Sequence, residues 1–334
     1  MIILKKAGRA LGKSFRRKRV WIPLLILALV YVNNSSLLAK PGTGTPSLLA
    51  HRGLAQTFDL DGVKWDTCTA ERIHKPEHPY LENTIPSMRA AFKAGADMVE
   101  LDVQLTKDNQ FAVFHDHMLE CRTEARGKIR DYTMAELRKL DVGYGYTADG
   151  GKTYPFRGKG TGLMPSLDEV LQAFPDRQLL LHVKSDDPVE GIMLARQLER
   201  LPADRLKRLA VYGGDQPVKA LEERIPELRT MSNESIKKCL LSYIAAGWTG
   251  YVPAACKNTQ LHIPDEIGPW LWGWPNRFLN RMDGAGTRVV IVKGKGGFSE
   301  GFDTAGDLSR LPDGYDKWIW TNRIDRIAPL FDSD

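Results

Sequence analysis

Apolar residues in this chain occur in short runs, which alternate with segments where apolar residues recur every three to four positions. The short runs predict strands and the intervening segments predict amphipathic helices. Strands are expected at 47–51, 97–103, 110–115, 178–184, 207–212, 226–231, 249–253, 287–292 and 316–320. Helices are expected at 83–95, 133–140, 166–174, 188–201, 215–224, 234–247, 264–281, 304–311 and 323–330. This alternation is typical of parallel βα units.

Three segments interrupt the alternation. The runs at 97–105 and 110–115 are joined by only Thr106–Asn109, which is too short for a helical crossover between parallel strands. We therefore expect an irregular repeat at the second and third strands. Residues 54–81 are polar and residues 143–162 are rich in glycine, so both are interpreted as insertions. Such loops commonly shape the active site of an α/β domain.

The amino-terminal segment differs in composition from the rest of the chain. Residues 1–19 contain eight Lys or Arg residues and no acidic residue, which leaves 39 basic and 41 acidic residues in the remainder. The formal charge of +6 therefore reflects this tail, and it does not indicate nucleic-acid binding by the remainder. Residues 20–39 form an apolar segment, interrupted at Asn33–Ser36, that is just long enough to span a bilayer.

This order predicts a basic cytoplasmic tail (1–19), a signal anchor or signal peptide (20–39), a linker (40–46) and one domain (47–334). No clear small-x-small cleavage site follows the apolar segment, which favours a retained anchor. Positive charge stays on the cytoplasmic side of a membrane. We therefore expect a single-pass protein of the cytoplasmic membrane whose domain lies on the periplasmic or other extracytoplasmic side. Secretion after signal cleavage is the alternative.

The four cysteines are compatible with an oxidising compartment. None belongs to a C-x-x-C pair, so a zinc-ribbon site is not expected. We expect the disulfides Cys68–Cys121 and Cys239–Cys256, although four cysteines allow three connectivities. Four reduced, buried thiols are the alternative.

Glu100 and Asp102 lie two residues apart within an apolar run. Side chains two apart in a strand point to the same face, so both carboxylates are expected to project from one side near the carboxyl end of the strand. Two such oxygen ligands suit Mg²⁺ or Ca²⁺. An ion-paired strand end is the alternative, because unpaired carboxylates are costly to bury.

Two histidines are the last residues of predicted strands. His51 precedes Arg52 and Gly53; glycine permits close approach to a phosphate, and the guanidinium can bind its oxygens. His115 precedes Asp116, which can orient the imidazole ring. Phosphodiester cleavage requires one proton removed from the nucleophile and one delivered to the leaving alkoxide, a task that two imidazoles can share. Taken singly, a histidine at such a position is more often structural.

In order and spacing, these motifs resemble the glycerophosphodiester phosphodiesterase family. The resemblance is close over residues 46–185 and extends in outline over 186–330. It implies a TIM-type (β/α)8 barrel. Such a barrel has eight strands, one fewer than the nine predicted here. The motifs that carry it are His51-Arg52-Gly53, Glu82-Asn83-Thr84, Glu100-Leu101-Asp102-Val103, Val113-Phe114-His115-Asp116, Tyr132–Leu137, Met164–Val170 and Thr321-Asn322-Arg323.

The resemblance also implies one divalent metal ion, Mg²⁺ or Ca²⁺, and a role for each motif. Glu82 is implied to be either a metal ligand or a partner of the phosphate-binding arginine, and a plain carboxylate at a helix amino terminus is the alternative. The implied roles are acid/base catalysis by His51 and His115, phosphate binding by Arg52 and Lys184, and metal binding by Glu100 and Asp102.

His182 departs from the family pattern, which typically has a glutamate of the metal site two residues before the lysine matched by Lys184. An imidazole removes one negative charge, and as a ligand it would move the metal preference towards Mn²⁺ or Zn²⁺. The alternatives are a contact between His182 and phosphate, an extra acid, or a degraded site.

The expected function is metal-assisted hydrolysis of glycerophosphodiesters, or of related lipid headgroup phosphodiesters, to a phosphomonoester and an alcohol outside the cytoplasm. A phospholipase D-like lyase that forms a cyclic phosphate and a non-catalytic barrel that binds phosphate esters are the alternatives. The expected partners are a small-molecule or lipid substrate and, through residues 20–39, a membrane. Trp270, Trp272 and Trp274 are expected to pack against the domain, with contact to lipid headgroups as the alternative. No role is assigned to His74, His78, His117 and His262.

Overall fold

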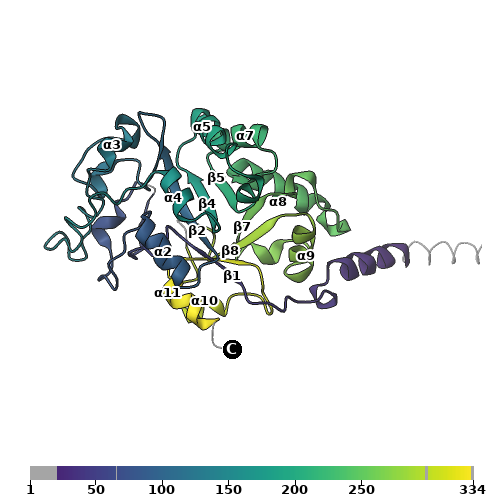
Figure 1. Ribbon diagram of the computed structural model, residues 1–334. Helices are drawn as coiled ribbons and strands as arrows, with labels where there is room; N and C mark the ends of the chain where they lie inside the picture. The colour runs from purple at the N-terminus through teal and green to yellow at the C-terminus, as the bar shows by residue number, and fades with distance from the viewer. Residues whose placement is uncertain (1–20, 65, 298–299, 332–334) are drawn as a thin grey trace, which may run out of the picture.

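The computed structural model describes residues 21–64, 66–297 and 300–331. At its centre, eight parallel strands follow the order β6-β5-β4-β2-β1-β9-β8-β7. The two end strands, β6 and β7, contact each other, so the sheet forms a nearly closed TIM-type barrel (Figure 1). The strands are β1 (Ser47–Ala50), β2 (Met98–Leu105), β4 (Gln178–Val183), β5 (Leu209–Gly213), β6 (Arg229–Ser232), β7 (Gln260–Pro264), β8 (Arg288–Val292) and β9 (Trp318–Thr321).

A ninth strand, β3 (Phe111–Val113), lies outside this order and pairs antiparallel with the end of β2. Val103 pairs with Val113 and Leu105 with Phe111. The short connection between the two runs therefore closes a hairpin, which Asn109 permits by adopting a positive φ of 60°. The expected irregular repeat is confirmed.

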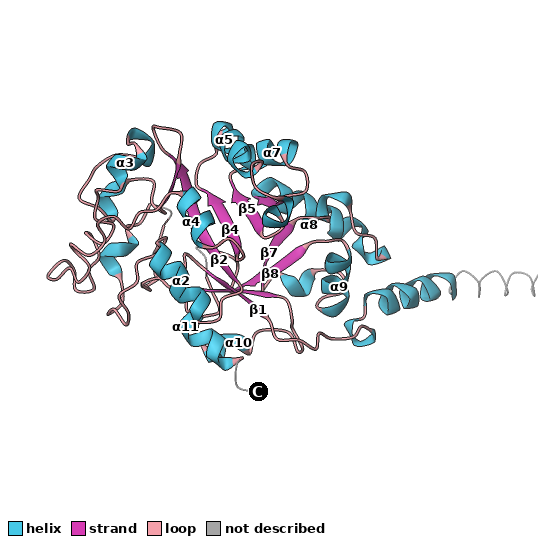
Figure 2. Cartoon of the chain, viewed as in Figure 1, coloured by secondary structure: helices cyan, strands magenta, loops and turns pink. Residues whose placement is uncertain are grey.

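Helices cover the outside of the barrel (Figure 2). Thr84, Ser166 and Ser232 begin α2, α4 and α8, because each side-chain oxygen accepts a hydrogen bond from the backbone N–H three residues later. Of the helices, α6 was not predicted. The bounds are α2 (Ile85–Lys93), α3 (Met134–Leu137), α4 (Leu167–Ala173), α5 (Pro188–Leu198), α6 (Ala203–Leu206), α7 (Asp215–Arg224), α8 (Asn233–Ala246), α9 (Asn276–Gly284), α10 (Ala305–Leu308) and α11 (Ile324–Ile327).

Two predicted elements near the carboxyl-terminal third are wrong. The expected strand 249–253 is a short 3-10 helix, η5 (Gly247–Thr249), followed by a loop that Gly250 enters at φ 90°. The strand at this place in the barrel is β7, where the polar His262 interrupts the apolar pattern.

The expected helix 264–281 begins only at Asn276, where α9 starts. The preceding residues form another short 3-10 helix, η7 (Gly268–Trp270), and a loop. Pro269 and Pro275 lack the N–H that a continuous helix needs, and Gly273 has φ 82°. The apolar periodicity that predicted one helix is therefore divided between η7 and α9.

Alternation along the strands decides which side chains enter the barrel. One face of the strands fills the interior with a buried cluster of Leu49, Met98, Leu180, Ala210, Val290 and Trp320. The next residues on that face of β2 and β4 are Glu100 and His182, because side chains two apart share a face. The barrel thus directs these polar side chains to the carboxyl ends of its strands.

The predicted insertions lie beside the barrel and share a second hydrophobic cluster with the segment after β3. The Cys68–Cys121 disulfide joins the first insertion to that segment. The Cys239–Cys256 disulfide joins α8 to the 3-10 helix η6 (Ala254–Cys256). Both expected pairings are confirmed. The second cluster includes Ala70, Ile73, Leu81, Phe114, Leu119, Ile129, Val142, Tyr146 and Phe156.

Residues 21–34 are helical and project away from the barrel at the right of Figure 1. The expected basic tail, residues 1–19, lies outside the described residues, as does the first residue of the expected membrane segment. Among the helices of the described part, none has the length and apolar content needed to cross a bilayer.

Candidate active site

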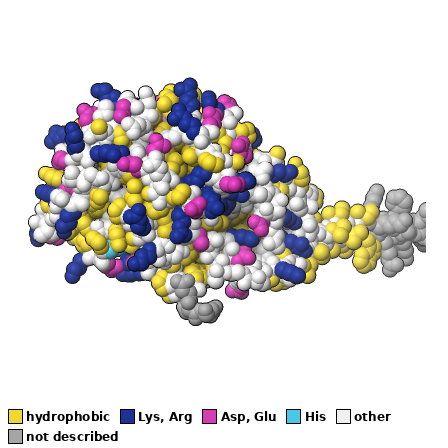
Figure 3. Space-filling model, in the orientation of Figure 1, with side chains coloured by type: hydrophobic (Ala, Val, Ile, Leu, Met, Phe, Trp, Pro, Cys, Tyr) yellow, Lys and Arg dark blue, Asp and Glu magenta, His cyan; other side chains and the backbone are white. Residues whose placement is uncertain are grey.

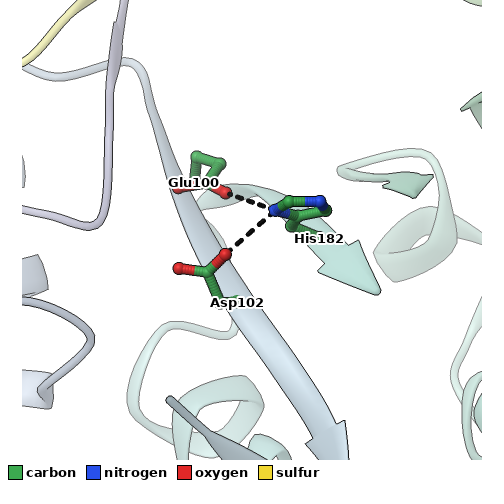
Figure 4. Close-up of side chains that lie close together, drawn as sticks. All are labelled: Glu100, Asp102 and His182. Atoms are coloured by element: carbon green, nitrogen blue, oxygen red, sulfur yellow. Dashed lines mark hydrogen bonds and ion pairs between the residues drawn. The ribbon is translucent and has the colours of Figure 1, made fainter. Parts of the chain in front are cut away.

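Three inward-pointing side chains meet at the carboxyl ends of β2 and β4 (Figure 4). Glu100 and Asp102 come from β2 and His182 from β4, and one candidate ligand atom of each lies within 4.8 Å of the others. His182 Nδ1 is 2.9 Å from Asp102 Oδ1 and 3.8 Å from Glu100 Oε1. Two carboxylates and one imidazole are suitable ligands for one divalent cation. The residues present therefore fit the metal that the sequence suggested.

The two carboxylates are fully buried but differ in their surroundings. Burial and the neighbouring Asp102 raise the pKa of Glu100 to about 8. Burial also opposes ionisation of Asp102, but the attraction of Lys184, whose Nζ lies 3.4 Å from Oδ1, and of other cationic groups holds its pKa well below the usual range. The repulsion between the two side chains is the interaction that a bound cation would offset.

His182 is held in place by an aromatic neighbour. Its ring stacks on Tyr212, with the ring centres 4.1 Å apart and the planes 13° from parallel. The Tyr212 hydroxyl donates a hydrogen bond to Glu100 Oε1 at 2.8 Å. Burial lowers the pKa of His182 to about 4, so its imidazole is neutral near pH 7. A neutral imidazole is the form that binds a metal ion.

Arg52 and Lys184 lie next to this group. Arg52 has φ 57°, and its Nη1 lies 3.0 Å from Glu82 Oε1 and its Nε 3.4 Å from Asp102 Oδ2. Glu82 is therefore an ion-pair partner of Arg52 and lies outside the group of three candidate metal ligands. Two cationic side chains beside the carboxylates form a place where a phosphate can bind.

The two histidines of the motifs are each oriented through Nδ1. His51 Nδ1 lies 2.6 Å from Asn322 Oδ1, and His115 Nδ1 lies 2.6 Å from Asp116 Oδ1. Nδ1 then carries the proton and Nε2 is the acceptor nitrogen, which in His51 accepts a hydrogen bond from Arg52 Nε at 3.0 Å. Burial, reinforced by Arg52, lowers the pKa of both imidazoles, so both are neutral near pH 7.

One cavity of about 400 Å³ brings these groups together. It is lined by His51, Arg52, His115, His182 and Lys184. The first insertion supplies a wall through Phe58, Val63 and the Cys68–Cys121 disulfide. The structure therefore unites the predicted acid/base, phosphate-binding and metal-binding residues in one site, with Glu82 behind Arg52.

Arg122 is a site residue that the sequence analysis missed. Its side chain is 2% exposed, and it lies between two carboxylates. Arg122 Nε is 2.7 Å from Asp116 Oδ2, and its Nη1 is 3.2 Å from Glu82 Oε2. It thus connects the partner of His115 to the partner of Arg52. No spacing in the sequence marks it, because these carboxylates come from separate segments.

Asn83 also has a role that the motif alone did not reveal. Its side-chain amide donates to Asp102 Oδ2 at 2.9 Å, and its Oδ1 accepts from the Asp102 backbone N–H at 3.0 Å. Asn83 adopts φ 58°, a conformation that asparagine tolerates better than most residues. It therefore fixes the rotamer of a candidate metal ligand.

His262 gives a prediction for acid stability. Arg288 Nη1 lies 3.4 Å from Gln260 Oε1, which turns the Gln260 amide nitrogen towards His262 Nε2 at 2.9 Å. Burial, with nearby His182, lowers the pKa of His262 from 6.5 to about 3, so the folded state keeps this ring neutral. The unfolded chain takes up the proton first, so stability is lost as the pH falls from 6.5 towards 3. The His262→Gln variant should lose less stability over this range in urea unfolding, whereas an unchanged pH slope would contradict this assignment.

Comparison with known proteins identifies the family of the chain. Residues 51–242 match the sequence model of the "Glycerophosphoryl diester phosphodiesterase family". A glycerophosphodiester phosphodiesterase of Bacillus subtilis is 37% identical over 124 residues, which are 36% of this chain and 41% of that protein. A human lysophospholipase D is 31% identical over 137 residues, 40% of each chain. The matches with the relatives thus span only about two fifths of their length.

Solved structures support the same fold. The glycerophosphoryl diester phosphodiesterase domain of a Mycobacterium tuberculosis protein has a TM-score of 0.60 at 17% identity, covering 86% of this chain and 99% of that one. An Oleispira antarctica phosphodiesterase in complex with the product sn-glycerol-3-phosphate has a TM-score of 0.55 at 20% identity, covering 86% and 98%. At these identities the likeness shows a shared barrel fold.

Proposed function

This chain belongs to the glycerophosphoryl diester phosphodiesterase family, and we propose that it hydrolyses glycerophosphodiesters or related headgroup diesters to a phosphomonoester and an alcohol. One observation carries the proposal. Two oriented histidines, two cationic side chains and His182 of the candidate metal group line the same cavity, and Glu100 and Asp102 lie within 4.8 Å of His182. The relative that holds sn-glycerol-3-phosphate as its product supports a glycerophosphodiester as substrate.

The arrangement suits in-line cleavage at phosphorus. Arg52 and Lys184 would bind the phosphoryl oxygens and offset their charge. Glu100, Asp102 and His182 would hold the divalent ion, which as a Lewis acid stabilises the charge that develops on those oxygens. One of His51 and His115 would take the proton of the attacking water at Nε2, and the other would first take up a proton from solvent at Nε2 and then give it to the leaving alkoxide.

Product analysis of the purified full chain tests the proposal. With glycerophosphocholine as substrate and each of Mg²⁺, Ca²⁺, Mn²⁺ and Zn²⁺, we expect a phosphomonoester signal in phosphorus NMR. A cyclic phosphate signal instead would identify the lyase reaction, in which a substrate hydroxyl attacks. Diester that binds but is not consumed with any metal would identify a binding protein.

For the metal, we propose that His182 moves the preference of the site towards Mn²⁺ or Zn²⁺, because imidazole nitrogen suits these ions better than Mg²⁺ or Ca²⁺. The His182→Glu variant should shift the ratio of Mn²⁺ to Mg²⁺ affinity towards Mg²⁺ by on the order of tenfold. Isothermal titration of metal-free protein measures this without turnover. His74→Glu, on the exposed face of the first insertion, adds the same charge as a control. Equal shifts in the two variants would argue against ligation by His182.

For the location, we propose that residues 20–39 attach the chain to a membrane and that the domain lies outside the cytoplasm. The apolar sequence, the basic residues before it and the two disulfides support this. Protease added to intact spheroplasts should digest a carboxyl-terminal epitope tag. A tag that is digested only after lysis would contradict this orientation.

A further inference from the structure

The apolar side chains of the helix at 21–34 are exposed. Its large side chains are largely exposed, including Trp21, Leu25, Leu27 and Tyr31. In Figure 3 this helix is a nearly continuous hydrophobic surface between the domain and the grey residues. The barrel does not cover these side chains, so they need another apolar environment.

The end of this helix is fixed to one side of the barrel. The side-chain amides of Asn33 and Asn34 donate to the Trp248 carbonyl at 3.1 and 2.7 Å, and Arg281 Nη2 donates to the Asn33 carbonyl at 2.8 Å. Ser36 Oγ donates to the Gly273 carbonyl at 2.8 Å. The helix therefore leaves the domain beside α8, η5 and the loop before α9.

A set of exposed apolar side chains surrounds this point. On α8 and just after it, Leu241, Ile244 and Trp248 are three and four residues apart, so they lie on one helical face. Trp272 lies beside them, because its indole N–H donates to the Ile244 carbonyl at 2.8 Å. We call the whole set the aromatic patch; it comprises Leu241 (68% exposed), Ile244 (49%), Trp248 (41%), Tyr251 (58%), Trp270 (81%) and Trp272 (39%).

Basic residues outnumber acidic ones along the segments that carry the aromatic patch. Residues 235–282, which carry all six members, contain five Lys or Arg and two acidic residues, Asp265 and Glu266, both of which pair with Arg310. The expected tail, residues 1–19, adds eight more basic residues before the helix in the sequence. Tryptophan and tyrosine prefer the headgroup level of a bilayer, and lysine and arginine attract anionic lipids.

We propose that the aromatic patch rests on the surface of the bilayer that holds residues 20–39, so that the domain lies against anionic lipid headgroups at a fixed orientation. This rests on the membrane attachment proposed above. Continuity with the apolar helix and the positive charge of the patch favour lipid over a protein partner. The Cys239–Cys256 disulfide would keep α8 and the Tyr251 loop together as one surface.

Photolabelling of the full chain in vesicles tests this inference. The vesicles contain phosphatidylcholine, phosphatidylglycerol and two trace lipids, one with a photoactivatable carbene precursor on its headgroup and one with the precursor on its acyl chain. Peptide mapping should show label at 21–32, and also at 241–251 and 267–272. Val189 on α5, which is 48% exposed, should stay unlabelled as a matched apolar control.

A triple variant provides the second measurement. The variant Leu241→Ser/Tyr251→Ser/Trp270→Ser should lose label in the aromatic patch and keep it at 21–32, with hydrolysis of a soluble diester unchanged. Label confined to residues 1–38 in the parent chain would overturn the inference while leaving the attachment intact. A patch that stays unlabelled but cross-links to a second copy would overturn it in favour of a protein interface. A chain that does not bind the vesicles at all would overturn the attachment as well, and activity on soluble diesters would still stand.

Discussion

Replacing His115 by glutamine is expected to lower kcat by about 10²–10⁴-fold and to leave the domain folded. Glutamine can keep a hydrogen bond to Asp116 but cannot accept and return a proton at the position of Nε2. Steady-state kinetics on glycerophosphocholine gives kcat, and thermal unfolding reports on the fold. His74→Gln is the control, because His74 is exposed and does not line the cavity.

A change of leaving group would separate the roles of His51 and His115. p-Nitrophenolate leaves without protonation, so on a p-nitrophenyl diester the variant that lacks the general acid should recover most of its rate. The variant that lacks the base should stay impaired on both substrates. If both variants stay within tenfold of the parent enzyme on glycerophosphocholine, neither histidine acts as proposed.

The shared face of Glu100 and Asp102 could be predicted from strand periodicity, whereas His182 was assigned to the same site through the family resemblance. Glu100 and Asp102 are two apart in one strand, and His182 is at the corresponding end of another. Parallel pairing of the two strands brings the three side chains together, independently of the loop conformations. The disulfide pairings were also correct, although the spacing of the cysteines allowed other connectivities.

Of the two partners of Glu82, Arg52 was one of the expected alternatives and Arg122 was not predicted. The Glu82 carboxylate pairs with two arginines. Arg52 belongs to the His51-Arg52-Gly53 motif, whereas Arg122 is forty residues further along the chain than Glu82, directly after Cys121. The segment around Arg122 has short elements and no clear periodicity, so nothing in it placed Arg122 beside the site. The predicted strand at 249–253 was also wrong. The apolar pair between Gly250 and Pro253 suggested a strand, but these flanking residues favour a turn, and Gly250 adopts a positive φ.

Replacing Arg122 by methionine is expected to destabilise the domain by about 3–5 kcal/mol and to lower kcat. The substitution removes one cationic partner from each of Asp116 and Glu82. A buried carboxylate that loses its partner lowers the free energy of unfolding by more than the intact pair contributes to it. Urea unfolding measures the stability. Arg126→Met removes an exposed guanidinium four residues away and serves as the control.

The pH dependence separates a positioning role for Arg122 from a purely structural one. Burial raises the pKa of Asp116, but Arg122 together with His115 and Arg52 holds it well below its usual range, so without Arg122 this pKa rises. The carboxylate that orients His115 would then be protonated at a higher pH, and the acid limb of kcat/KM should move to higher pH. Arg122→Lys keeps the charge but cannot reach both carboxylates with one compact ammonium group, so it should restore part of the stability and little of the rate. A variant that is unstable but keeps the parent pH profile would show that Arg122 supports the fold and does not position the catalytic histidine.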